Sequence, residues 1–134
     1  SYKAKEVFEK LKREICFIYP FIEEILGLDS TKDGKYLVAT TADYLMVYKT
    51  AVGNVNGYLT SLKKLKLKPA KIELSEEIKE KYGLHDFTFT KAKFDNPFDS
   101  EEKYIISTVG RCLLMWSIED VFNGNIEPKV KRYL

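Results

Sequence analysis

Two short stretches of apolar residues, separated by a two-residue turn, mark the clearest structural unit in the chain. Tyr36–Thr41 is rich in β-branched residues, Ala42-Asp43 interrupts it, and Tyr44–Tyr48 follows as a second apolar run. Runs of this length that are bounded by turn residues are typical of strands. The preceding Asp33-Gly34 pair indicates a further tight turn, because Gly readily adopts a positive φ. The pattern therefore predicts a β-hairpin over residues 36–48.

The same layout returns later in the chain. Lys103–Val109 matches Lys35–Thr41, Gly110-Arg111 matches the first turn, and Cys112–Trp116 matches Tyr44–Tyr48, all at one constant offset in residue number. Upstream, Phe94-Asp95 matches Leu28-Asp29 at a slightly shorter offset, because the loop before the second hairpin is longer. Identical residues occupy the paired positions 35/103, 36/104, 40/108 and 45/113. The sequence therefore predicts an internal repeat, which limits the possible folds more than any single element does.

Each hairpin is flanked by further strand-like segments. Ile25–Leu28 and Phe87–Phe94 precede the two hairpins, and the second of these begins with alternating apolar and polar residues. Tyr58–Lys68 and Ile126–Tyr133 follow them, and both contain period-two alternation with lysine. We therefore expect each unit to be an antiparallel sheet of four strands.

The remaining segments separate or precede the two units. Leu74–Tyr82 is expected to be a short helix, with Ser75 as its N-cap and Gly83 as its stop. The start of the chain has helical spacing to about Arg13, and the apolar run Ile15–Phe21 then reads as a strand. The predicted organisation is a helical lead-in or the end of a preceding unit at 1–24, a first unit at 25–68, a helical insertion at 69–85 and a second unit at 86–134.

The repeat resembles a blade of the WD-repeat family. An apolar-Asp pair, an Asp-Gly turn, an apolar strand, a short turn and a strand closing on Tyr48 or Trp116 follow one another in the family's order. The closing pairs Tyr48-Lys49 and Trp116-Ser117 depart from the Trp-Asp common in the family, and the Gly-His pair is missing. The resemblance implies a mainly β fold, a partial β-propeller built of four-stranded antiparallel blades with a short helical insertion. The missing blades would come from a longer parent chain or from association.

The order of segments is also similar to part of the exchange factor that initiates COPII coat assembly at the endoplasmic reticulum. That resemblance implies a guanine-nucleotide exchange role, with a small GTPase or a coat component as partner, at the cytosolic face of the organelle. It rests on spacing, so no functional residue is transferred to this chain.

Composition narrows the classes of partner and compartment. The 22 basic and 20 acidic residues give a net charge of +2, which argues against nucleic acid as a partner. Cys16 and Cys112 are too few for a disulfide framework, so both are expected to be reduced and buried in an intracellular, cytoplasmic protein. Apolar runs long enough to span a membrane are missing from the sequence. Ser1–Lys12 is too charged to resemble a signal peptide.

Residues that could carry catalysis have simpler interpretations. His85 is the only histidine and is expected in an ordinary polar loop, and Cys112 is expected to pack within a strand. The two glycines in Val52–Gly57 lack the Gly-Lys-Ser/Thr sequence of a phosphate-binding loop. Glu76, Glu77 and Glu80 alternate with lysines on the predicted helix, which is typical of a solvated surface. The sequence predicts no cofactor, no metal site and no enzymatic activity.

Partner binding is the function that these patterns favour. The candidate contacts are Asp43 and Arg111 in the hairpin turns, and Phe98 in the loop before the second hairpin. A basic stripe adds Lys63, Lys64, Lys66, Lys68 and Lys71, which also suits the exposed face of an outer strand. The predicted function is a scaffold for protein–protein interaction. The alternatives are the exchange factor described above and an enzyme with an unrecognised site.

Overall fold

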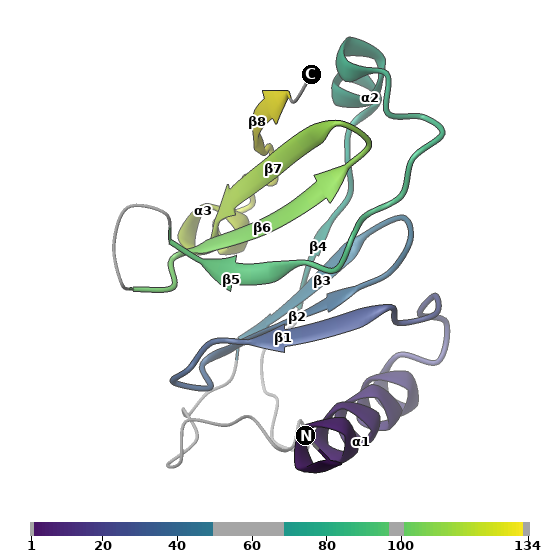
Figure 1. Ribbon diagram of the computed structural model, residues 1–134, viewed down its shortest axis with the longest axis vertical. Coiled ribbons are helices and arrows are strands. Elements are labelled where there is room, and N and C mark those ends of the chain that lie inside the picture. Colours follow the sequence, from purple (N-terminus) through teal and green to yellow (C-terminus); the bar gives the residue numbers. More distant parts are fainter. Residues whose placement is uncertain (1, 50–68, 97–100, 133–134) are drawn as a thin grey trace.

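The computed structural model describes residues 2–49, 69–96 and 101–132 as two stacked sheets with three helices (Figure 1). In chain order the described elements are α1 (Tyr2–Ile18), β1 (Gly27–Ser30), β2 (Tyr36–Thr40), β3 (Leu45–Lys49), β4 (Ala70–Ile72), α2 (Glu76–Tyr82), β5 (Lys93–Asp95), β6 (Tyr104–Val109), β7 (Cys112–Ser117), α3 (Ile118–Phe122) and β8 (Lys129–Arg132). The first sheet has the order β1-β2-β3-β4 and the second β5-β6-β7-β8, with antiparallel neighbours throughout. The mainly β fold is thus confirmed, and it is consistent with a partial β-propeller.

The two central hairpins have the same register. Tyr36 pairs with Lys49 in the first sheet, and Tyr104 pairs with Ser117 in the second. At the other end of each hairpin, a threonine pairs with a leucine: Thr40 with Leu45 and Thr108 with Leu113. The constant offset found in the sequence relates every one of these pairs, so the predicted repeat is confirmed as a structural repeat.

The first strand of each sheet corrects one part of the sequence alignment. Asp29 pairs with Val38 in the first sheet. The repeat equivalent of Val38 is Ile106, and Ile106 pairs with Lys93 in the second sheet. The structural counterpart of Asp29 is therefore Lys93, and the match of Asp29 with Asp95 is wrong by two residues. Because side chains alternate with a period of two, this shift leaves both aspartates on the same face of their sheets.

The main core lies between the two sheets. Val38, Leu45 and Val47 of the first sheet are completely buried against the second. The second sheet contributes buried residues at every other position of β6 and β7, namely Ile105, Val109, Cys112, Leu114 and Trp116. This alternation follows from the pleat of a strand, which directs successive side chains to opposite faces.

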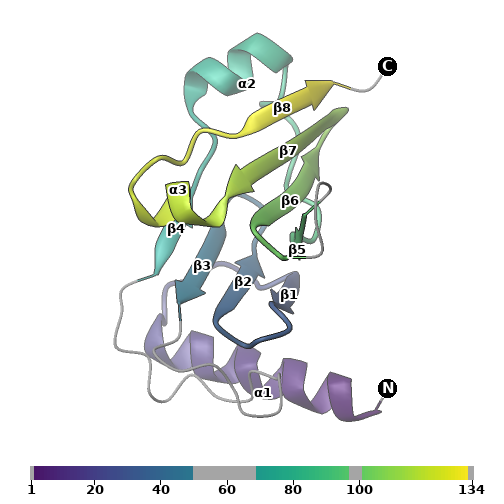
Figure 2. The same ribbon diagram turned by 90° about the vertical axis from the view of Figure 1, so that its left-hand side faces the viewer.

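Helix α1 covers the other face of the first sheet (Figure 2). Leu11 and Ile15 are one helical turn apart, and both are buried against Leu37, Ala39 and Tyr48. The strand expected over Ile15–Phe21 is therefore wrong, because Ile15 belongs to a helix that ends at Ile18. A short apolar run has no periodicity of its own, and packing on the sheet decides its conformation here.

The outcomes differ for α2, for the fourth strand of the first sheet and for α3. The helix after residue 74 is confirmed, with the Ser75 Oγ accepting a hydrogen bond from the Ile78 N–H at 3.2 Å and Gly83 at φ 66°. The fourth strand of the first sheet is β4, which lies within the range that the sequence assigned to the helical insertion. The strand predicted at 58–68 lies outside the described residues. Sequence reasoning missed α3, which Ser117 caps through the Asp120 N–H.

Hydrogen bonds from polar side chains join the two sheets. The Asp29 Oδ2 accepts from the Phe94 N–H at 2.8 Å, and the Thr40 Oγ1 accepts from the Ala92 N–H at 2.9 Å. At one end of the interface, the Glu102 Oε1 accepts from the Lys32 N–H at 2.7 Å. The stacking of the sheets is therefore fixed by specific polar contacts as well as by burial.

Candidate partner-binding surface at the hairpin ends

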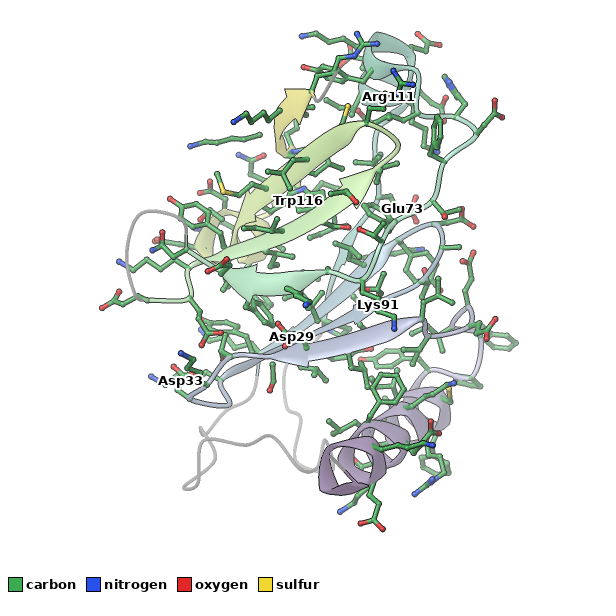
Figure 3. The ribbon with its side chains drawn as sticks, viewed as in Figure 1. Asp29, Asp33, Glu73, Lys91, Arg111 and Trp116 are labelled. Carbon is green, nitrogen blue, oxygen red and sulfur yellow. The ribbon has the colours of Figure 1, made fainter. Side chains whose placement is uncertain are left out.

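The two hairpin turns lie at the same end of the stacked sheets. The Phe89 N–H donates a hydrogen bond to the Ala42 carbonyl oxygen at 3.0 Å, and Phe89 also forms an isolated bridge with Val109. The segment around Phe89 therefore connects the β2–β3 turn with the β6–β7 turn. Figure 3 shows Arg111 at the second of these turns, close to α2. We call this region, formed by Asp43, Tyr44, Lys71, Phe87 and Arg111, the hairpin-end surface.

A buried threonine closes the first turn. The Thr41 Oγ1 donates to the Tyr44 carbonyl oxygen at 2.9 Å and accepts from the Tyr44 N–H at 3.1 Å. These bonds satisfy the backbone without a residue of positive φ, so the turn tolerates Ala42 and Asp43. The Asp43 side chain is exposed.

The second turn depends on a glycine. Gly110 has φ 57°, and an added Cβ would lie 3.1 Å from the Phe87 ring and 3.3 Å from Leu84. Leu84 is buried, whereas the Phe87 ring rests on the turn with 54% of its surface exposed. The chain thus holds an apolar ring in solvent beside Arg111, which is itself exposed.

Mixed charges surround the first turn. The Lys71 Nζ lies 4.3 Å from the centre of the Tyr44 ring and 2.7 Å from the Glu73 Oε1, and this ion pair raises the pKa of Lys71. The Tyr44 hydroxyl accepts the Glu23 N–H at 2.9 Å. Desolvation, followed by the hydrogen bond and the charge of Asp43, raises the pKa of Glu23. The surface therefore presents both signs of charge around its aromatic groups.

Of the residues considered for catalysis, His85 lies on the surface and Cys112 lies in the core. The His85 Nε2 is 3.2 Å from the Glu76 Oε2, and Glu80 offers a third ligand atom within 4.8 Å of the other two. All three side chains are exposed, and the Lys79 Nζ lies 3.8 Å from the Glu76 Oε1. This arrangement is the solvated, charge-balanced surface that the sequence predicted.

The two cysteines differ in their environments. Cys112 is buried in the core between the sheets, as expected, and its thiol is free. Cys16 is exposed on α1, so the prediction that it packs in the interior is wrong. Ile15, its neighbour, takes the buried position instead, since adjacent residues of a helix point in different directions.

The structure describes only part of the predicted contact set. Asp43, Arg111 and Lys71 are described and exposed, and the turns bring the first two to one end of the molecule. Sequence reasoning missed Phe87 as a contact residue, because it placed Phe87 and Phe89 in one strand over 87–94. That strand is wrong over most of its length, since β5 covers only Lys93–Asp95, and Phe87 is exposed whereas Phe89 is buried. The residues Phe98, Lys63, Lys64, Lys66 and Lys68 lie outside the described residues.

Comparison with known proteins identifies the family. Residues 5–134 match the family model of the VID27 C-terminal WD40-like domain. The chain belongs to this family. The VID27 family match accounts for the resemblance to WD-repeat blades, since it covers both sheets and α2.

One curated relative supports the same assignment. The chain is 30% identical over 121 residues to "Vacuolar import and degradation protein 27" of Schizosaccharomyces pombe. The alignment covers 83% of this chain and 15% of that protein, so the chain spans a small part of its relative's length. No solved structure matches the chain.

The comparisons correct the second resemblance. They point to the VID27 family and give no support to the COPII exchange factor or to a site at the endoplasmic reticulum. That resemblance rested on the order of segments, which divergent WD-repeat proteins share because they share the fold. In the described ranges 2–49, 69–96 and 101–132, no helix has the length and apolarity to cross a membrane.

Proposed function

We propose that this VID27-family chain is a non-enzymatic, intracellular module that binds protein partners through the hairpin-end surface. Propellers and related scaffolds bind partners through loops that a rigid sheet framework holds in place. The observation that carries the proposal is the exposed Phe87 ring, which rests on the turn formed by Gly110 and the charged residue Arg111. Large aromatic residues and arginine are the residue types most enriched at the centres of protein interfaces.

Several contacts support a surface that is prepared for binding. The Phe87 ring lies against the Gly110 turn, where a Cβ added to the glycine would be 3.1 Å from the ring. The Ala42 carbonyl and Phe89 N–H bond keeps the two turns together, so little conformational entropy remains to be lost on binding. Lys71, Asp43 and Arg111 would supply the polar rim and would select partners by charge.

Quantitative affinity capture tests this proposal. The full chain serves as bait in an extract of its own cells, together with the variants Phe87→Ser and Arg111→Glu. Lys49→Glu is the matched control, because Lys49 is exposed at the opposite end of β3. We expect one set of proteins to be lost from both test variants and retained by the control. A captured set that is the same for all four baits contradicts the proposal.

A further inference from the structure

The hairpin-end surface lies at the ends of the strands and is shared by two turns. Phe89 bonds to the Ala42 carbonyl oxygen of the first turn and forms a bridge with Val109 beside the second. The two sheets stack through their faces, where the buried core lies. Stacking of sheet on sheet therefore does not use the ends of the hairpins, and the charges found there call for a separate explanation.

The turn of the second sheet is basic. Arg111 lies in the turn itself, and Arg132 pairs with Cys112, the next residue along the chain. Both arginines are exposed, and neither forms an ion pair with a carboxylate among the described residues. The guanidinium group presents a planar fork of donors that matches a carboxylate. This turn therefore presents two positive groups that are suited to acidic side chains.

The turn of the first sheet is acidic. Asp43 lies in this turn, and its side chain is hydrogen-bonded to that of Glu23. Desolvation, followed by this hydrogen bond and the negative charge of Asp43, raises the pKa of Glu23. Lys71, the nearest lysine to Tyr44, already lies 2.7 Å from Glu73. The Glu23 and Asp43 carboxyl groups thus lie together without an ion pair in the described ranges, and a cation placed beside them would relieve their repulsion.

Phe87 supplies an apolar contact between these two charged turns. Its ring is 54% exposed and lies against the turn that Gly110 and Arg111 form. Two residues further on, the chain reaches Phe89 and its hydrogen bond to the first turn. An apolar side chain that packs on Phe87 would therefore have the basic turn on one side and the acidic turn on the other.

We propose that the hairpin-end surface binds an extended segment of another protein in which an apolar residue separates an acidic end from a basic end. The apolar residue packs on Phe87. The acidic end meets Arg111 and Arg132, and the basic end meets Glu23 and Asp43. This inference rests on the proposed function and adds the charge pattern of the partner. Complementary charges in such a surface fix the register of the bound segment more than they add affinity.

The length of the segment follows from the size of the surface. Stacked sheets lie about 10 Å apart. An extended segment of seven residues spans about 23 Å. Seven residues are therefore enough to carry an apolar centre and to place one charged end at each turn.

Fluorescence anisotropy with labelled synthetic peptides and the full chain tests the inference. The block peptide is Glu-Glu-Ser-Leu-Ser-Lys-Lys, and the mixed peptide is Glu-Lys-Ser-Leu-Ser-Lys-Glu, both with blocked termini. The two have the same composition and the same net charge. We expect the block peptide to bind about fivefold more tightly at low salt, since each exposed ion pair contributes modestly. The difference is expected to shrink at high salt, because salt screens exposed charges.

A double charge reversal assigns the two ends of the peptide. Arg111→Glu/Arg132→Glu makes both turns acidic, so this variant should bind the block peptide less tightly and prefer Lys-Lys-Ser-Leu-Ser-Lys-Lys. Arg13→Glu/Lys49→Glu is the control with the same change in net charge, because Arg13 is exposed on α1 and Lys49 is exposed at the opposite end of β3. Phe87→Ser should weaken the binding of every peptide. Near-ultraviolet circular dichroism establishes that each variant is folded, and the comparison of the two peptides on the wild type needs no variant.

The outcomes distinguish this inference from the proposed function. Equal binding of the block and mixed peptides overturns the charge pattern, and the proposed function survives if Phe87→Ser weakens both. Block-peptide binding that Phe87→Ser leaves unchanged counts against both, because the hairpin-end surface is then not involved. No saturable binding of the block peptide up to about 1 mM overturns the inference, while affinity capture still decides the proposed function. A double reversal that changes preference no more than its control also overturns it.

Discussion

The Asp29 carboxylate accepts a hydrogen bond from the Phe94 backbone N–H at 2.8 Å, and this bond joins the first strands of the two sheets. Figure 3 shows Asp29 between β1 and β5. A carboxylate that receives a backbone N–H forms a stronger bond than a neutral acceptor does. This contact therefore sets how the second sheet lies on the first, and its energetic weight can be measured.

Replacement of Asp29 by Ala is expected to reduce the free energy of unfolding by about 1–3 kcal/mol, because the Phe94 N–H loses its acceptor at a partly buried site. Urea denaturation followed by circular dichroism measures this change. Asp86→Ala is the control, since Asp86 is exposed, and such surface changes stay within about 0.5 kcal/mol. Equal effects of the two substitutions would show that the hydrogen bond between the sheets contributes nothing.

The pH dependence of stability gives a second test of Asp29. Burial raises the pKa of this carboxyl above its usual value, and the negative charge of Glu102 adds to the shift, while the Phe94 N–H opposes it. The native state therefore binds the proton more tightly than the unfolded chain does. The contribution of Asp29 to the free energy of unfolding is therefore fully present at pH values below the unfolded pKa of about 3.9. It is lost as the pH rises through the raised native pKa.

Asp29→Asn isolates that pH effect, because the amide oxygen remains an acceptor but does not titrate. We expect the free energy of unfolding of the wild type, minus that of Asp29→Asn, to fall as the pH rises from about 3.5 to neutrality. Urea titrations at several pH values measure this difference. A difference that increases with pH would mean that the native state lowers the pKa of Asp29 instead.

Gly110→Ala is expected to destabilise the chain by about 2–4 kcal/mol, because φ is positive and the new Cβ would press on Phe87 and Leu84. Gly83→Ala is the matched control, since Gly83 also has a positive φ but no atom lies within 4 Å of an added Cβ. Only the conformational cost of about 1–2 kcal/mol applies there. The double variant Phe87→Ala/Gly110→Ala should recover part of the loss. Equal effects at both glycines would argue against a fixed Phe87 ring.

Tyr48 and Trp116 occupy equivalent positions and are expected to respond in opposite directions to substitution by Phe. Trp116→Phe removes the bond to Ile126 and should lower the free energy of unfolding by about 2 kcal/mol. Tyr48→Phe removes a buried hydroxyl without a partner among the described residues, and should raise it by about 1 kcal/mol. Thermal unfolding of both variants measures the two shifts. Destabilisation by Tyr48→Phe would reveal a bonded hydroxyl.

The hairpins were predictable because their signals are local. Asp33-Gly34 and Gly110-Arg111 mark turns by their residue types, and Gly34 and Gly110 do adopt positive φ. Residues that are related by the constant offset occupy the same register positions in the two hairpins, since a period-two pattern fixes which face of a strand is buried. The caps of α2 at Ser75 and Gly83 were readable for the same reason.

The candidate site was predictable only in part. Asp43 and Arg111 could be chosen because turn residues of a sheet framework face solvent. Nothing local indicated that Phe87 would be exposed and Phe89 buried, because Phe89 bonds to Ala42 and forms a bridge with Val109, which both lie far from it along the chain. The approach of the two turns depends on a hydrogen bond between Ala42 and Phe89, which no sequence pattern records.

The sequence by itself determined the two hairpins and their repeat, because alternation and turn chemistry act over a few residues. Each unit does have four strands, but the fourth strand of the first sheet is β4 and lies outside the segment that the alternation predicted. The tertiary structure decided that Ile15 lies in a helix, that Lys93 rather than Asp95 is the counterpart of Asp29, and that β4 follows Pro69. Each of these outcomes depends on which segments pack or pair with one another. That choice is made by burial between segments distant in the chain, and local propensity is too weak to anticipate it.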